Sequence, residues 1–177
     1  MYKCRLVMIV LLGALLNPVS ANSADVPPFV DELVPNSSVV GEGRLRYWLW
    51  DVYDARLYAP NGEWDEREPY ALRLTYLREL NGEEIAKRSI EEIRKQGLMD
   101  EVKLASWYTQ MSHIFPDVAQ GEEITGVYRE DRVTVFYDSG KEIGRVLDPQ
   151  FGQYFFRIWL SESTSAPELR KQLLALE

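Results

Sequence analysis

Residues 38–58 read SVVGEGRLRYWLWDVYDARLY. The stretch contains no proline and is rich in β-branched and aromatic residues, a composition that favours a β-strand. Alternation places Tyr47 and Tyr53 on one face and Trp48 and Trp50 on the other. We expect such a strand to lie between two layers or to line a cavity, because a half-exposed strand normally keeps one polar face.

Asp51 interrupts this apolar strand with a negative charge. An unpaired carboxylate among aromatic rings would be costly, so the sequence predicts a partner among Arg44, Arg46 and Arg56. We interpret this pair as structural, and not as part of a general base.

The rest of the chain changes between strand-like and helix-like patterns. Apolar residues recur with period two from Tyr70 onward and with helical spacing from Asn81 onward. Pro116 ends a second helical stretch, and turn-forming residues separate the later strands. We expect, in order, a turn over 59–64, a strand over 70–80, helices over 81–97 and 100–115, and an antiparallel meander of strands over 122–130, 132–140 and 141–147.

Two further helices are expected to close the chain. Asp148 before Pro149 is typical of an N-cap followed by proline at the first helical position. Ser165 with Glu168 three residues later fits a capping box. The first of these helices carries an apolar stripe that predicts packing on a sheet, formed by Phe151, Tyr154, Phe155, Ile158 and Trp159. The stripe lacks the flanking basic residues of a membrane-surface helix.

In the helix expected over 100–115, the apolar side is assigned to Val102, Ala105, Met111 and Ile114, together with Trp107 or Tyr108.

The N-terminus has the pattern of a secretory signal peptide. Residues 1–21 combine a short basic start, eleven apolar residues and a small-residue exit, with cleavage after Ala21 or, as the alternative, after Ala24. The apolar run covers about half of the roughly 20 residues that a membrane-spanning helix needs. We therefore expect export to a periplasm, an extended leader over 22–36, which carries three prolines, and a single domain over 37–177.

Charge and composition exclude several classes of function. Removal of residues 1–21 takes away Cys4 and leaves 18 basic against 28 acidic residues, a net charge of −10. An excess of negative charge argues against nucleic acid and against an anionic membrane as partners. With no cysteine, neither a disulfide nor a cysteine metal site can be assembled. With His113 as the only histidine, the same holds for a histidine-rich zinc site and for a histidine-based triad with cysteine. We expect no metal and no cofactor.

A group of arginines and tyrosines is the best candidate for a binding site. A guanidinium beside phenols in an apolar cleft would hold the carboxylate or enolate of an otherwise apolar small molecule. The alternative is that the rings pack the sheet against its helices and the arginines reach solvent. The group comprises Arg44, Arg46, Tyr53, Tyr58, Tyr76 and Tyr108.

Several separate segments resemble, in order, the exported bacterial branch of the chalcone isomerase-like family. The resemblance covers about residues 37 to 176 and implies an α+β fold, an open-faced β-sandwich in which helices cover one side of a large antiparallel sheet and a smaller strand element lies beside it. The family includes enzymes that close a chalcone into a flavanone and relatives that bind fatty acids without catalysis. The segments are VGEGRLRYWLWDVYDARLYAP (40–60), ALRLTYLRELNGEEIAKRSIEEIRKQG (71–97), WYTQMSHIFPDVAQGEEITGVY (107–128) and FGQYFFRIWLSESTSAPELRKQLL (151–174).

The resemblance also implies where a site would lie. The family's enzymes use an arginine, a threonine and tyrosines around the cleft. Counting back from Tyr53, the threonine position falls at Trp48, which cannot donate that hydroxyl hydrogen bond, and Arg44 and Arg46 are out of step with the catalytic arginine. These departures argue against isomerase activity. The ligand-binding candidates are Arg44, Arg46, Trp48, Tyr53 and Tyr108.

Three hypotheses remain at this stage. The first is a non-catalytic periplasmic protein that binds a small amphipathic acid such as a fatty acid. The second is an intramolecular lyase or isomerase that acts on an enone-type compound through Arg44 or Arg46 and Tyr53. The third is an envelope protein-interaction module with a filled cleft, and the absence of a cavity beside Tyr53 would favour it. Neither nucleic acid nor stable membrane insertion is expected in any of them.

Overall fold

The computed structural model describes residues 26–176, so the predicted signal peptide over 1–21 lies outside the described residues. The elements in chain order are α1 (Pro28–Leu33), β1 (Ser37–Tyr47), β2 (Trp50–Pro60), β3 (Tyr70–Tyr76), α2 (Gly82–Lys95), α3 (Glu101–Ile114), β4 (Glu123–Tyr128), β5 (Thr134–Asp138), β6 (Lys141–Val146), α4 (Pro149–Leu160) and α5 (Pro167–Leu173).

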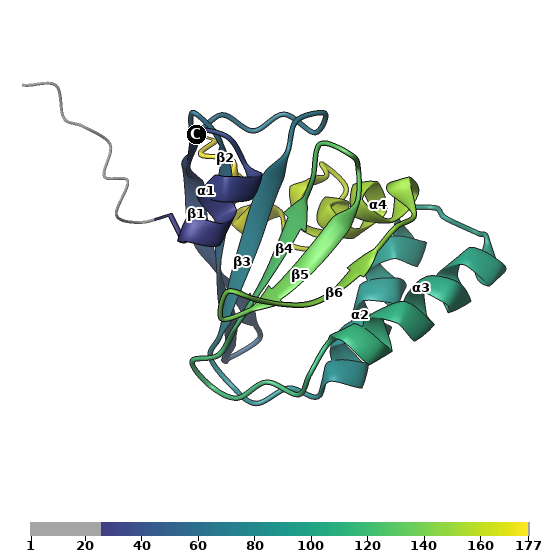
Figure 1. Cartoon of the computed structure of the whole chain (residues 1–177). Coiled ribbons are helices and arrows are strands. Elements are labelled where there is room, and N and C mark those ends of the chain that lie inside the picture. Colours follow the sequence, from purple (N-terminus) through teal and green to yellow (C-terminus); the bar gives the residue numbers. More distant parts are fainter. Residues whose placement is uncertain (1–25, 177) are drawn as a thin grey trace, which may run out of the picture.

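The strands form one antiparallel sheet in the order of the sequence, from β1 to β6. Helices α2 to α5 pack on one face of the sheet, and α1 lies on the opposite face (Figure 1). Each strand pairs with its neighbour in the sequence, and β4, β5 and β6 form the antiparallel meander expected over 122–147. The result is an α+β domain with a helical layer on one side.

The segment over 38–58 is not one strand but a hairpin of β1 and β2. Tyr47 pairs with Trp50, so Trp48 and Leu49 form the turn between the strands. The prediction of a continuous strand is wrong because this turn contains none of the glycine, asparagine or proline residues that mark hairpin turns. Trp48 instead adopts the left-handed conformation, with φ of 56°.

Part of the segment that was expected to be extended forms α1. Its first residue is Pro28, which suits the first turn of a helix because that position needs no backbone hydrogen bond. Val30 and Val34 are buried against Tyr58 and Val127 on the second face of the sheet. Proline was taken as a sign of irregular structure here, whereas it starts a helix.

The two closing helices begin differently. The cap at α4 is confirmed, because the Asp148 carboxylate accepts a hydrogen bond from the backbone N–H of Gln150 at 3.0 Å. The capping box at α5 is wrong: Ala166 is the N-cap residue and no side chain caps it. The Ser165 hydroxyl instead donates to Glu92 on α2 at 2.8 Å.

The apolar stripe of α4 is confirmed as core. Phe151, Phe155 and Trp159 are buried, and Phe136 of β5 meets Phe155 edge-on with 5.2 Å between ring centroids. Such edge-to-face pairs add about 0.5 to 1.5 kcal/mol each beyond the burial of area. Aromatic packing therefore joins the helical layer to the sheet.

The expected apolar side of α3 is partly wrong. Trp107 and Met111 are buried as expected, but Val102 is 83% exposed and Ala105 is also exposed. Leu104, which was not assigned to the apolar side, is buried. No helix within residues 26–176 is long and apolar enough to cross a membrane.

Gly152 provides a test of the packing between α4 and the sheet. A Cβ atom there would lie 2.5 Å from Thr134 Oγ1 and 2.6 Å from Tyr128 Cδ2, and both neighbours are buried. Gly152→Ala should gain about 1 kcal/mol of helix propensity and lose more through overpacking. We expect a net loss of about 2 kcal/mol in the free energy of unfolding, measured by urea denaturation.

Gln153→Ala is the control, because Gln153 is exposed on the same helix. It should change the free energy of unfolding by less than about 0.5 kcal/mol. A stabilised Gly152→Ala protein would show that α4 does not press on the sheet as described.

Candidate functional site

A cavity of about 650 Å³ lies between the sheet and the helical layer. Its sheet side is formed by apolar residues of β3 and β5, such as Leu72, Leu74 and Phe136, and its helix side by Phe155 and Phe156 of α4. The volume lies within the range of about 300 to 1,000 Å³ that is typical of small-molecule sites. Since Tyr53 also lines it, this cavity disfavours the hypothesis of a filled cleft.

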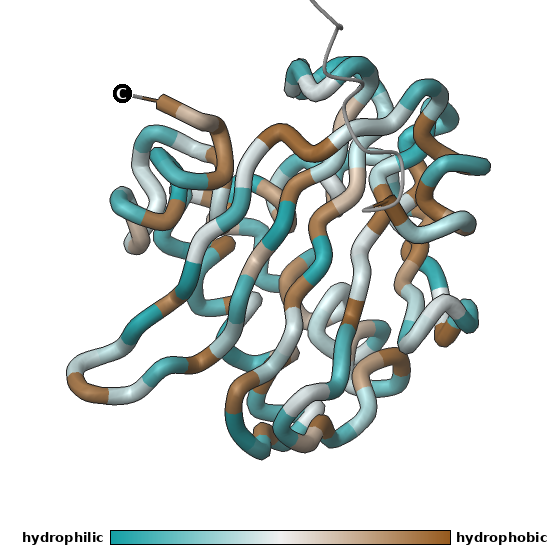
Figure 2. The backbone as a smooth tube through the Cα atoms, turned by 90° about the vertical axis from the view of Figure 1, so that its left-hand side faces the viewer, coloured by the Kyte–Doolittle hydropathy of each residue, from teal (hydrophilic) through white to brown (hydrophobic). Residues whose placement is uncertain are grey.

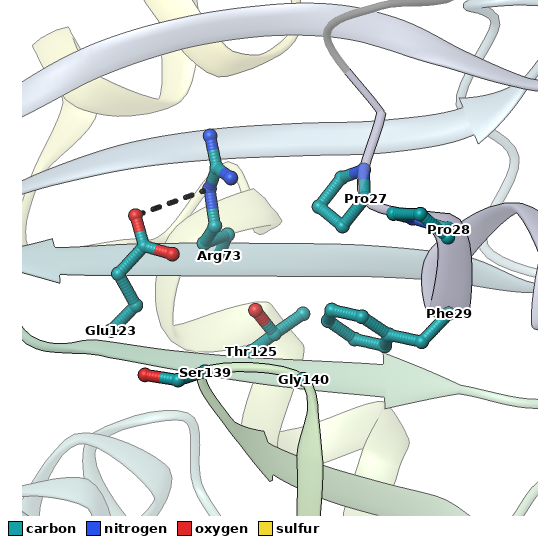
Figure 3. Close-up of a pocket in the computed structure, with 8 residues that line it drawn as sticks. All are labelled: Pro27, Pro28, Phe29, Arg73, Glu123, Thr125, Ser139 and Gly140. Carbon is teal, nitrogen blue, oxygen red and sulfur yellow. Dashed lines mark ion pairs between the residues drawn. The ribbon is translucent and has the colours of Figure 1, made fainter.

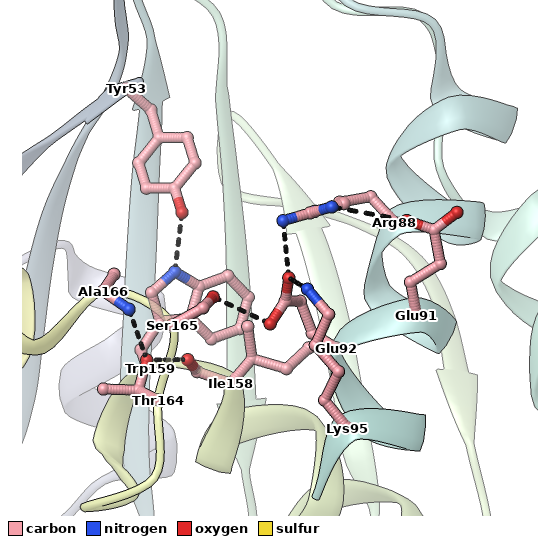
Figure 4. A network of polar contacts seen from close by, with 10 residues as sticks. All are labelled: Tyr53, Arg88, Glu91, Glu92, Lys95, Ile158, Trp159, Thr164, Ser165 and Ala166. Atoms are coloured by element: carbon pink, nitrogen blue, oxygen red, sulfur yellow. Dashed lines mark hydrogen bonds and ion pairs between the residues drawn. The ribbon is translucent and has the colours of Figure 1, made fainter. Parts of the chain in front are cut away.

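Two phenols point polar groups at this apolar space. The Tyr53 hydroxyl accepts a hydrogen bond from the Trp159 indole N–H at 2.8 Å (Figure 4), and the rings of Tyr53 and Tyr76 meet edge-on at 6.1 Å. Within residues 26–176, the Tyr53 O–H proton has no acceptor and the Tyr76 hydroxyl has no hydrogen bond. Burial raises the pKa of both phenols, so both remain neutral donors.

A charged network closes the side of the cavity next to α2. The Glu92 carboxylate forms ion pairs with Arg88 at 2.6 Å and with Lys95 at 2.9 Å. It also accepts a hydrogen bond from the Ser165 hydroxyl at 2.8 Å (Figure 4). Burial alone would raise the pKa of Glu92, but these hydrogen bonds and positive charges outweigh it and hold the pKa below its usual value. Glu92 is therefore an engaged carboxylate that fixes the loop before α5 onto α2.

Apart from Ser165, the exposed residues that line the cavity lie at the end of the β1–β2 hairpin, after β3 and on α2, and we call this part of the cavity its mouth. Arg46 and Arg78 belong to it. Arg46 is held by Asp51, with 2.6 Å between Nε and Oδ1. The Arg78 guanidinium lies over the Trp50 ring at 5.3 Å, and no carboxylate within residues 26–176 pairs with it. The donors of Arg78 are therefore available to an acidic ligand.

The predicted partner of Asp51 is confirmed, since both Arg44 and Arg46 bond to it. The hydrogen bond from Arg46 is the main cause that lowers the pKa of Asp51. Arg44 also forms two bonds to Asp54, at 2.6 and 2.9 Å. Arg44 thus stabilises the hairpin and does not line the cavity.

The structure separates the predicted site residues. Arg46 and Tyr53 line the cavity, whereas Trp48 is 85% exposed at the hairpin turn. Tyr108 lies on α3, where its hydroxyl donates to Glu83 at 2.8 Å, away from the cavity. Whether any of these residues binds a ligand stays a prediction.

Sequence reasoning missed Trp159 and Arg78 as site residues. Trp159 was assigned wholly to the packing of α4, and the indole N–H gave no sign of its partner 106 positions away. Arg78 follows β3 without any motif that distinguishes it from other surface arginines. Only the sheet register, which pairs Tyr53 with Tyr76, shows that the end of β3 lies beside β2 and the cavity.

A second, shallower hollow of about 490 Å³ lies on the opposite face of the sheet, beside α1 (Figure 3). Its charged groups are already engaged: Arg73 lies 3.8 Å from Glu123, which also accepts a hydrogen bond from Thr75. Within residues 26–176, no group of three histidine, cysteine or carboxylate residues could hold a metal ion. The cavity beside Tyr53 is therefore the candidate site.

The buried phenols predict a loss of stability in alkali. Burial raises the pKa of Tyr53, Tyr70 and Tyr76 in the folded protein, whereas an unfolded tyrosine ionises near pH 10. This stability is complete below about pH 10 and falls as the pH rises toward the raised values, because only the unfolded chain then releases protons. Each phenol should lower the free energy of unfolding by about 1.4 kcal/mol per pH unit.

Urea unfolding at a series of pH values from about 9 to 11 measures this slope. Tyr53→Phe should reduce the slope above about pH 10 by about 1.4 kcal/mol per unit. An unchanged slope would mean that Tyr53 is not held neutral by burial.

Comparison with known proteins places this geometry in a family. A family model described as chalcone isomerase-like matches residues 39–175. No curated protein sequence matches significantly. Among solved structures, the fold is similar to that of a fatty-acid binding protein from Arabidopsis thaliana, with a TM-score of 0.63 and 13% identity, over 79% of this chain and 87% of that chain.

At this identity the structural likeness shows the fold alone. The antiparallel sheet with its helical layer is the α+β fold that the resemblance implied. Because the family model covers well over half of the sequence, the chain belongs to the chalcone isomerase-like family.

Proposed function

We propose that the protein binds a small amphipathic acid, such as a fatty acid, without catalysing a reaction on it. The observation that carries this proposal is an apolar cavity of about 650 Å³ with neutral phenol donors inside and an unpaired guanidinium at its mouth. The structural similarity to a plant fatty-acid binding protein supports it.

The charges around the cavity favour one orientation of the ligand. At the end of the cavity next to Glu92, Arg88 and Lys95 already pair with the Glu92 carboxylate, so their donors are engaged before a ligand arrives. At the mouth, the Arg78 guanidinium can form charge-assisted hydrogen bonds, while Arg46 is already engaged by Asp51. The acid group therefore lies at Arg78 and the hydrocarbon chain extends between the sheet and α4.

The two buried phenols serve a ligand oxygen. Tyr76 and Arg78 are two residues apart and both line the cavity, and Tyr53 faces Tyr76 across the strand pair. An oxygen near the head of the ligand would satisfy the hydroxyl protons that lack acceptors within residues 26–176. A purely hydrocarbon ligand would leave both donors unpaired, so we expect it to bind more weakly.

The proposed compartment is the periplasm of a bacterium, as in the exported branch of the family. The signal pattern over residues 1–21 supports this proposal. Intact-mass measurement of the protein recovered from a periplasmic extract tests it. A chain that begins at Asn22 or Asp25 is expected, and an intact chain in the cytoplasm would contradict it.

An isomerase that acts on an enone-type compound is the second candidate. It is favoured by Arg46 and Tyr53, which line the same cavity. Against it, Trp48 lies at the threonine position implied by the family resemblance and is exposed at the hairpin turn. We expect no acceleration of hydroxychalcone ring closure by the wild-type protein. Acceleration that Tyr53→Phe abolishes would establish the enzyme.

Arg78→Ala should weaken the binding of a long-chain fatty acid by about 10- to 100-fold, since a hydrogen bond to a charged group contributes roughly 1.5 to 3 kcal/mol. The corresponding fatty alcohol should bind wild type and variant alike. Displacement of a fluorescent fatty acid measures both affinities. Arg157→Ala removes a guanidinium from an exposed position on α4 and is the matched control.

If Arg78→Ala changes the affinities for the acid and the alcohol equally, the acid group does not lie at Arg78. Native mass spectrometry of protein taken from its own periplasm provides an independent test. A co-purified amphipathic acid is expected, and the absence of any bound acid, together with no thermal shift across a panel of fatty acids, would contradict the proposal.

A cavity-filling variant separates binding from stability. Leu74 lines the cavity from β3, so Leu74→Trp should occupy the space of the ligand and reduce fatty-acid affinity at least about 10-fold. Because the added ring enters an existing space, the thermal midpoint should fall by only a few degrees, roughly as for a loss of less than 1 kcal/mol. Val102→Trp adds the same ring at an exposed position and should leave binding unchanged. Full affinity in Leu74→Trp would place the ligand elsewhere.

A further inference from the structure

Four consecutive large side chains are exposed at the end of the β1–β2 hairpin. Their exposed fractions are 64% for Tyr47, 85% for Trp48, 93% for Leu49 and 63% for Trp50. We call these residues 47–50 the hairpin tip. The hairpin projects away from the other strands (Figure 2), and the remaining large exposed apolar residues within 26–176 are dispersed over other segments.

The hairpin tip has large apolar residues at turn positions where the backbone conformation favours glycine or asparagine. Two-residue hairpin turns normally contain glycine or asparagine, because these residues accept positive φ at little cost. Here Trp48 has φ of 56°, which is uncommon for a bulky side chain. A sequence that breaks a local rule in this way, with no buried contact in return, points to a functional role for the side chains.

The hairpin tip is also one side of the cavity mouth. Tyr47 and its neighbour Arg46 line the cavity, and Trp50 lies under the Arg78 guanidinium at 5.3 Å. Whatever surface the tip contacts is therefore brought against the opening through which a ligand enters.

We propose that the hairpin tip is an anchor for the interfacial region of a lipid bilayer, and that it places the cavity mouth on the membrane surface. The inference that an amphipathic acid passes there between bilayer and cavity rests on the proposed function. Tryptophan and tyrosine have an apolar ring with a polar edge, and they are enriched at the boundary between lipid and water.

The shape and the charge of the tip favour lipid over a protein partner. A specific protein interface takes about 20 to 30 residues on each partner, whereas the exposed apolar tip has four residues, and a bilayer admits such a convex tip. Around it, the guanidinium groups of Arg44 and Arg46 pair with the carboxylates of Asp51 and Asp54. Arg78, over the Trp50 ring, adds one positive charge, so the local charge is small. Zwitterionic lipid fits such a surface, while the net negative charge of the chain opposes anionic lipid.

Vesicle flotation tests the anchor. The protein without residues 1–21 is mixed with phosphatidylcholine vesicles or with vesicles that contain phosphatidylglycerol. We expect flotation with phosphatidylcholine that is unchanged by added salt and no stronger with the anionic vesicles. The double variant Trp48→Ser/Leu49→Ser should reduce the partition coefficient at least about 10-fold, because it removes the two most exposed apolar side chains of the tip.

The matched control is Met99→Ser/Val102→Ser, which removes exposed apolar side chains from the region of α3. Its partition coefficient should stay within about twofold of wild type. No flotation of the wild type, equal flotation of the tip variant, or binding only to anionic vesicles that salt abolishes would each overturn the anchor. The anchor would also be overturned if the wild type does not bind vesicles but self-associates with increasing concentration, and the tip variant does not. That result would assign the tip to a protein contact.

Ligand measurements keep this inference distinct from the proposed function. In the absence of vesicles, the tip variant should bind a fluorescent fatty acid as tightly as wild type, but transfer of that probe from vesicles to protein should slow at least about 10-fold. Flotation without any fatty-acid binding would retain the anchor and reject the proposed function. Fatty-acid binding, with transfer by the tip variant as fast as by wild type, would reject the anchor and retain the proposed function.

Discussion

The hydrogen bond from the Trp159 indole to the Tyr53 hydroxyl connects the helical layer to the sheet at the wall of the cavity. It joins α4 to β2 across 106 residues of sequence, and it lies where the two layers are otherwise separated by the cavity. A buried indole N–H without an acceptor would cost about 1 to 3 kcal/mol. This bond therefore fixes how far α4 stands from the sheet, and the open space depends on that separation.

Aromatic packing makes such an open space compatible with a stable domain. Phe155 meets Phe136, Phe151 and Trp159 at centroid distances between 5.2 and 5.4 Å, so the helix is supported along its length by rings that hold their geometry. On the far side, the Glu92 network holds α2 to the loop before α5. The cavity is thus bounded by stiff groups that do not readily collapse into it.

Elements with one strong local signal could be predicted from the sequence, and elements decided by tertiary contacts could not. The Asp148 cap, the α4 stripe and the meander each follow from local chemistry or periodicity. The hairpin turn at Trp48 escaped prediction because its residues resemble strand. The Ser165 capping box failed because α5 begins one residue later than expected, and the Ser165 hydroxyl bonds to Glu92. Arg78 could not be recognised as a site residue before the register placed it beside the cavity.

The outer half of the hairpin shows why two of the predicted binding residues have a structural task. Cross-strand register sets Arg44 opposite Asp54 and Arg46 opposite Asp51. A single exposed ion pair contributes at most about 1 kcal/mol to the free energy of unfolding. Here Arg44 bonds to both Asp51 and Asp54, and Asp51 also bonds to Arg46, so the pairs form one network. A two-stranded ribbon alone is only marginally stable in water. The network therefore holds the projecting ribbon in register, so that apolar side chains can stand in solvent beside the cavity mouth while Arg78 keeps its donors for a ligand.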